Sequence, residues 1–200
     1  MQAQNHLTFN TGYHQLIYEL DADIPQILAS EEDKIQKHSN GLGMELSYLL
    51  SYDNNKILSF QIGTQIESLL LERSFENATD PAIPESLLFK LSRKDLYFGF
   101  GYGLKFSGKS SPSYFFAIGQ TAFNLGLVEE KFSFFNTRSL QTYGWSVGGS
   151  LGYRLKLNKK IFKPGLFVQA QTNYMRTYYF NSLKFIRNTI GIKFGLGYAF

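Results

Sequence analysis

The chain has 200 residues, enough for one large domain or two small ones, with a formal net charge of +4 and no cysteine. The lack of cysteine excludes a disulfide framework and any site that depends on a thiol. Lys and Arg form no run, so the charge indicates a solvated surface and no nucleic-acid partner. No stretch approaches the ~20 apolar residues of a membrane-spanning helix. The first residues lack the basic start and apolar core of a signal peptide, so the chain is either cytoplasmic or an exported protein whose leader has been removed.

Eight segments alternate between bulky apolar residues and small or polar ones, and a period of two assigns them to β-strands. In chain order they are residues 6–18, 41–52, 57–71, 96–107, 113–127, 142–157, 162–175 and 189–200. In residues 96–107 the bulky positions are even, as at Phe98 and Phe100, whereas in residues 142–157 they are odd, as at Trp145. The phase of residues 113–127 is ambiguous, which a β-bulge would explain.

The connections between these strands alternate in length. Residues 53–55, 108–112 and 158–160 are short enough for hairpin turns. Residues 19–40, 72–94, 128–140 and 177–184 form longer loops. All long loops therefore lie at one end of the sheet, and the short turns and both termini lie at the other. We find no repeat, linker or domain boundary, so we expect a single domain over residues 1–200.

The composition of the two strand faces indicates which face points outward. A soluble sandwich or barrel would bury the bulky face and expose the other one, but that face carries Gly, Ser, Thr and Gln with few charges. Eight strands also enclose an interior only just wide enough for side chains. An inverted barrel removes both difficulties, because closure satisfies the backbone hydrogen bonds that lipid cannot. We therefore predict an all-β fold: a transmembrane, antiparallel, up-and-down barrel of eight strands with long outer loops and short periplasmic turns.

Aromatic residues near the ends of the apolar stripes are candidates for the two interface girdles of such a barrel. At the short-turn end these are Tyr52, Phe106, Tyr114, Tyr153 and Phe200. At the long-loop end they are Tyr143, Trp145, Tyr174, Tyr178 and Tyr179.

With this architecture and an aromatic C-terminal strand, the chain resembles the small eight-stranded outer-membrane proteins of Gram-negative bacteria, of the OmpA and OmpX type. The resemblance implies a bacterial outer-membrane location, contact with the lipopolysaccharide leaflet, both termini in the periplasm and a signal peptide already removed. It also implies that the closing strand carries the signal read by the barrel-assembly machinery, at Phe194, Leu196, Tyr198 and Phe200. The abundance of Phe, Tyr, Asn and Lys resembles Bacteroidota outer-membrane barrels, including the PorT-like group.

Six charged residues fall on the inward face of the predicted barrel: Glu45, Glu67, Lys105, Arg154, Lys156 and Lys193. A charge in a narrow lumen must be paired or hydrated, because desolvating it alone is costly. Closure places the first strand between those of Glu45 and Lys193, so we expect these two to pair. Such a network either plugs the lumen or lines a gated ion path.

The three histidines, His6, His14 and His38, match no catalytic or metal spacing and are expected to be surface polar residues. We therefore expect no enzymatic activity, no cofactor and no metal.

The first two long loops carry apolar residues at helical spacing, which indicates contacts with the barrel mouth or with a partner. These are Ile24, Ile27 and Leu28 in the first loop, and Leu87, Leu88 and Leu91 after a helix start at residues 84–85 in the second.

The most favoured function is structural or interactional: an outer-membrane barrel with a plugged lumen, working through its loops or wall, as an accessory subunit of a larger membrane assembly. One alternative is a narrow channel or small-solute conduit, which planar-bilayer conductance would reveal. A second alternative is a lipid-A-modifying enzyme, which would change the acyl chains of lipid A.

Overall fold

Eight β-strands make up almost all of the described part of the chain. The structure is a computed structural model that describes residues 3–20, 38–52, 54–74, 86–106, 113–132, 135–157, 164–180 and 185–200. The strands are β1 (Ala3–Leu20), β2 (His38–Tyr52), β3 (Lys56–Ser74), β4 (Ser86–Phe106), β5 (Tyr114–Phe132), β6 (Phe135–Lys156), β7 (Gly165–Tyr179) and β8 (Phe185–Ala199). Within the described residues there is no helix of the length and apolarity needed to cross a membrane.

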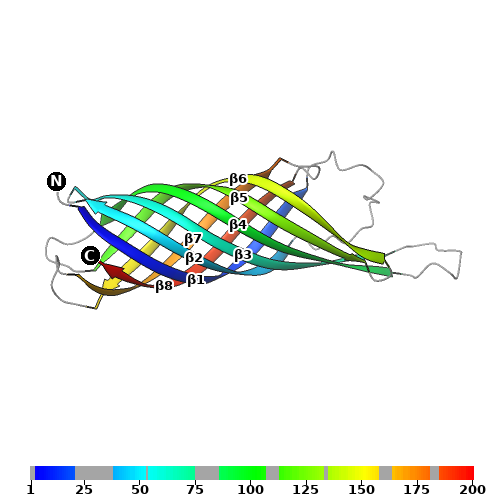
Figure 1. Ribbon diagram of the computed structural model, residues 1–200, viewed down its shortest axis with the longest axis horizontal. Coiled ribbons are helices and arrows are strands. Elements are labelled where there is room, and N and C mark those ends of the chain that lie inside the picture. Colours follow the sequence, from blue (N-terminus) through cyan, green and yellow to red (C-terminus); the bar gives the residue numbers. More distant parts are fainter. Residues whose placement is uncertain are drawn as a thin grey trace, which may run out of the picture.

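The strands form one closed barrel in which each strand pairs with its sequence neighbours (Figure 1). Closure joins β1 to β8 in antiparallel register, with Phe9 opposite Leu196 on β8 and opposite Leu46 on β2. The predicted fold class, an up-and-down antiparallel barrel of eight strands, is confirmed. Since no sheet edge remains within the closed part, every ladder hydrogen bond there is made inside the chain.

The barrel is apolar outside and polar inside, as the alternation predicts. Phe98, Phe194 and Leu196 are 46%, 60% and 55% exposed, whereas Ser59 and Ser146 on the inner face are 0% and 2% exposed. Bulky apolar residues cover the outside of all eight strands. Soluble monomers rarely expose an apolar patch larger than a few hundred Å². The wall of this barrel therefore faces lipid.

Most of the predicted girdle residues lie on the outer wall. Phe106 and Tyr153 are exposed near the short-turn end and Tyr52 is half-buried there, while Tyr143, Trp145 and Tyr174 are exposed toward the other end. Two further predictions were wrong: Tyr114 turns toward the lumen and packs on its apolar cluster, and Tyr179 is buried inside. Both residues occupy inward-facing positions of their strands. Their place along the strand gives their height in the barrel correctly, but it does not tell which face of the sheet they lie on.

Several strands extend further into the expected long loops than the sequence predicted. The expected loops at 72–94 and 128–140 are largely strand, because β3 reaches Ser74, β4 begins at Ser86, β5 reaches Phe132 and β6 begins at Phe135. The loop expected at 177–184 is also shortened by β7, which ends at Tyr179. Apolar alternation is imposed by lipid, so it fades where a strand leaves the bilayer even though its pairing continues.

The ambiguous phase of β5 does not come from a bulge within residues 113–127. Pairing of β5 with β6 is regular there, and the register shift lies beyond it, between Glu130 and Phe132. The ambiguity arises because Phe116 and Ile118 point into the lumen while Phe115 points outward. Phe116 and Ile118 form a buried apolar cluster with Leu49 and Ile57, in the half of the lumen near the short turns.

The short-turn end also carries both chain ends of the described structure (Figure 1). The β2–β3 turn needs a left-handed residue, and Asn55 supplies it with a φ of 65°. At the same end the Phe200 amide donates to the Asn5 carbonyl over 2.9 Å, so the final residue is tied to β1. We call this the inner end of the barrel, and the opposite end the outer end.

Candidate functional site

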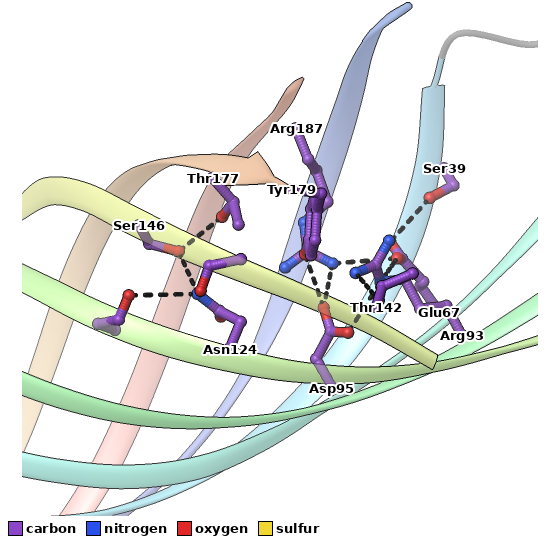
Figure 2. Close-up of polar contacts among 12 residues, drawn as sticks. Ser39, Glu67, Arg93, Asp95, Asn124, Thr142, Ser146, Thr177, Tyr179 and Arg187 are labelled. Atoms are coloured by element: carbon purple, nitrogen blue, oxygen red, sulfur yellow. Dashed lines mark hydrogen bonds and ion pairs between the residues drawn. The ribbon is translucent and has the colours of Figure 1, made fainter. Parts of the chain in front are cut away.

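Two arginines and two carboxylates form a buried cluster near the outer end of the lumen (Figure 2). Arg93 Nε, on β4, lies 2.8 Å from Asp95 Oδ1 and 3.5 Å from Glu67 Oε1. Arg187 Nη1, on β8, lies 3.1 Å from Glu67 Oε1 and also pairs with Asp95 Oδ2. None of the four is more than 4% exposed. Their charges cancel, and we call them the outer network.

Neutral side chains complete the outer network. The Tyr179 hydroxyl donates to Asp95 Oδ2 over 3.0 Å, and the Arg93 guanidinium lies 3.9 Å from the centre of the Tyr179 ring. Arg93 Nη2 also donates to Thr142 Oγ1 over 3.0 Å. Buried ions are tolerated when their remaining donors and acceptors find partners, and these contacts supply them. The network therefore joins β3, β4, β6, β7 and β8 across the lumen.

Glu45 and Lys193, the pair expected from the sequence, meet at mid-height. Lys193 Nζ lies 2.6 Å from Glu45 Oε2, and both side chains are buried. Glu45 accepts two more hydrogen bonds, from the Tyr97 hydroxyl over 2.8 Å and from Asn10 Nδ2 over 2.9 Å. The four residues come from β1, β2, β4 and β8, so this middle pair also spans the barrel.

A chain of amides links the middle pair to a buried arginine nearer the inner end. Gln169 Nε2 donates to Asn10 Oδ1 over 2.8 Å, and Arg154 Nη2 donates to Gln169 Oε1 over 2.6 Å. Arg154 Nη1 donates to the Tyr114 hydroxyl over 2.8 Å, and its guanidinium lies 4.0 Å from the Phe167 ring centre. No described carboxylate pairs with Arg154, whose charge is stabilised by dipoles and a ring face.

The remaining two predicted lumen charges lie lower and are less enclosed. Lys105 and Lys156 are half-buried near the inner end, and Lys105 Nζ donates to Ser51 Oγ over 3.0 Å. Arg93, Asp95 and Arg187 were not predicted as lumen residues, because they lie outside the strands expected from the sequence. Continuing the inward parity of Lys105 and Lys193 toward the outer end would have placed all three on the inner face.

The sequence suggested that the histidines are surface residues, and for His6 and His14 this was wrong. His6 and His14 are both inside the lumen at 3% exposure, and the side chain of His38 lies outside what the structure describes. Inward parity on β1 explains both buried positions. Among the residues that the structure describes, no group of three His, Asp or Glu side chains is placed to hold a metal ion.

The loop contact candidates lie outside the described side chains. Ile24, Ile27 and Leu28 belong to residues that are not described. Leu87, Leu88 and Leu91 lie in β4, so the prediction of a helix for this segment was wrong. This segment is paired on both sides, with β3 through Leu71↔Phe89 and with β5 through Phe89↔Phe132.

Four strands continue past the rest of the barrel at the outer end. Pairing of β2 with β3 ends at Asn40↔Ser68, whereas β3 and β4 remain paired to Ser74↔Ser86. On the other side, β6 and β7 part after Gly144↔Tyr179, whereas β5 and β6 remain paired to Phe132↔Phe135. Figure 1 shows this extension at the right of the molecule. We call it the projecting sheet; among the described residues, its edges are Leu69–Ser74 of β3 and Phe135–Leu140 of β6.

Comparison with known proteins gives similarity at the level of structure. No protein-family model and no curated protein matches the chain. Ail, the attachment invasion locus protein of Yersinia pestis, shares 17% identity over 100% of both chains, with a TM-score of 0.49. Neisserial surface protein A shares 10% identity over 100% of this chain and 98% of its own, with a TM-score of 0.46. The translocator domain of the autotransporter NalP from Neisseria meningitidis shares 10% identity over 98% and 87%, with a TM-score of 0.37.

The closed eight-stranded wall and the inverted polarity described above decide the architecture. The fold is that of the small outer-membrane barrels. The resemblance seen in the sequence is thereby confirmed at this level, while the narrower likeness to PorT-like barrels finds no support in the comparisons.

Proposed function

We propose that this protein is an integral barrel of the bacterial outer membrane with a plugged lumen, no enzymatic activity and an interaction role, as an accessory subunit of a larger outer-membrane assembly. Both termini would then lie in the periplasm, and Phe194, Leu196, Tyr198 and Phe200 would carry the assembly signal. The plug is supported by the outer network, the middle pair and the inner apolar cluster, which follow one another along the lumen. Discrete conductance steps in planar bilayers would contradict it.

The projecting sheet is the observation that favours an interaction role. A 22-residue strand such as β6 is roughly 75 Å long, and at a tilt of ~40° it rises roughly 55 Å, about twice the ~25 Å apolar band of such barrels. The part of the strands that exceeds the apolar band lies toward the outer end. Charged side chains appear on the outer wall there: Lys94 is exposed, and its Nζ lies 3.9 Å from Glu129 Oε1. Strand edges that leave the membrane can add an extended segment of a partner through backbone hydrogen bonds.

The β6 edge offers a defined position for a test. Phe180 N donates to Tyr143 O over 2.9 Å, so the backbone groups of Tyr143 face away from β5. Backbone direction alternates along a strand, so the N–H of Ser139, four residues earlier, faces the same edge. Ser139→Pro removes that N–H and blocks strand addition, and it leaves the ladder to β5 in place.

The matched control is Ser139→Ala, which removes the same hydroxyl and keeps the N–H. Purification in mild detergent from native membranes should recover the same partners with wild type and Ser139→Ala, and lose them with Ser139→Pro. All three proteins should show equal heat-modifiable migration on gels, which reports a folded barrel. If Ser139→Pro retains every partner of the wild type, the β6 edge is not the interaction surface.

A further inference from the structure

A small cavity lies in the lumen between the outer network and the middle pair. Its volume is about 40 Å³, and its lining includes Arg187 from the outer network together with Tyr97 and Lys193 beside Glu45. It is thus bounded by charged groups that are already paired with one another. The cavity is therefore a separate space between the outer network and the middle pair.

Five buried polar atoms, on side chains that line this cavity, have no hydrogen-bond partner among the residues that the structure describes. They are His14 Nδ1, Gln65 Nε2, Asn173 Oδ1, Arg187 Nε and Thr189 Oγ1. The five residues come from β1, β3, β7 and β8, and none is more than 7% exposed. Buried polar groups in folded proteins nearly always have hydrogen-bond partners. Because these five atoms belong to side chains around the same cavity, a single occupant of the cavity can supply their partners.

We propose that this cavity is a binding site for a cluster of ordered water molecules that bridges the outer network and the middle pair. A polar cavity needs roughly 10–15 Å³ to hold one water, so this one has room for more than one. Water satisfies the whole set of atoms, because it can accept from Arg187 Nε and Gln65 Nε2 and donate to Asn173 Oδ1. The Thr189 hydroxyl can do either.

The balance of charge favours water over an ion. Arg93 and Arg187 offset Glu67 and Asp95, and Lys193 offsets Glu45, so the groups around the cavity are neutral as a set. Adding a halide or a metal cation would leave at least one uncompensated charge in a buried site, which is costly. The lumen is therefore filled at this height by solvent that belongs to the structure.

His14 depends most on this water. Its ring packs over glycine positions of both neighbouring strands: a Cβ at Gly43 would lie 2.6 Å from Nε2, and one at Gly191 would overlap Nδ1. Because the ring is confined between these two walls, it cannot swing away to find another partner for Nδ1. A bridging water supplies the partner where the ring stands.

A crystal structure of the full chain at high resolution, grown with sodium bromide in place of chloride, tests the proposal directly. We expect density peaks within hydrogen-bond distance of Asn173 Oδ1, Thr189 Oγ1 and Gln65 Nε2, and no anomalous signal from bromide in the cavity. An empty or collapsed cavity would overturn the proposal. A bromide peak there would also overturn it, in favour of an anion site.

The substitution Thr189→Val gives an independent reading through stability. Val has nearly the shape of Thr, so the change replaces the hydroxyl with a methyl group of similar size and removes its hydrogen bonds. If Thr189 binds water, the urea midpoint of unfolding in detergent should fall; if the cavity is dry, loss of an unsatisfied hydroxyl should leave the midpoint equal or raise it, and the proposal fails. Thr172→Val, at an exposed position of β7 on the lipid-facing wall, is the matched control and should not lower the midpoint.

Discussion

Glu45 is the residue at which four strands of the lumen meet. Its carboxylate accepts hydrogen bonds from the Lys193 ammonium on β8, the Tyr97 hydroxyl on β4 and the Asn10 amide on β1. A buried pair of this kind adds little over two well-packed apolar residues, but removing one partner leaves the other charge buried and alone. The consequence of losing Glu45 is therefore larger than the stability that the pair contributes.

We expect Glu45→Met to reduce the free energy of unfolding by about 3–5 kcal/mol, because Lys193 then lies in the lumen without a carboxylate. The double variant Glu45→Met with Lys193→Met should recover most of that loss. Urea titrations in detergent or lipid vesicles measure both. A double variant no more stable than Glu45→Met would show that the damage comes from packing and not from the orphaned charge.

At the scale of strands, the alternation of outward and inward positions predicted much of the fold and part of the lumen site. The faces of Trp145, Phe98 and Phe194 were predictable because lipid demands apolar residues at every second position, and the Glu45–Lys193 contact followed from closure. Arg93 and Arg187 lie where the strands leave the bilayer, so no apolar alternation marks them as strand residues, although the parity of Lys105 and Lys193 places both on the inner face. Their partners were not predictable, because those are chosen across the barrel by three-dimensional proximity.

Strand faces also determine the cost of adding a side chain to a glycine. A Cβ at Gly103, on the inner face of β4, would overlap the carbonyl oxygen of Ala117 on β5. A Cβ at Gly119, on the outer face of β5, would find its nearest atom, the Tyr102 carbonyl oxygen, at 3.8 Å. The two glycines lie on adjacent strands, so they differ mainly in the direction that they face.

We expect Gly103→Ala to lower the free energy of unfolding by about 1–3 kcal/mol, since backbone would have to move. Gly119→Ala should be neutral or stabilise by about 0.5–1 kcal/mol, because alanine restricts the unfolded chain without a clash. Each variant is compared with wild type by urea unfolding. Equal losses at the two positions would contradict the assignment of inner and outer faces on these strands.

For the whole molecule, the two ends of the barrel differ, and the proposed orientation in the membrane can be tested through that difference. The inner end carries the β2–β3 turn and both chain ends, and the outer end carries the projecting sheet. In the proposed orientation the β2–β3 turn lies in the periplasm, as the short turns of outer-membrane barrels do. Since the chain contains no cysteine, single cysteines can report this orientation without a background to remove.

We expect Ser139→Cys, on the projecting sheet, to react with a membrane-impermeant maleimide on intact cells. Asn54→Cys, in the β2–β3 turn, should react only after the outer membrane is permeabilised. Phe98→Cys, on the wall, should resist the reagent until detergent denatures the barrel, because acyl chains cover it. Reaction at Asn54→Cys but not at Ser139→Cys on intact cells would mean that the barrel is inserted the other way. Reaction at Phe98→Cys as well would mean that the apolar wall is open to water, and that the barrel does not lie in a membrane.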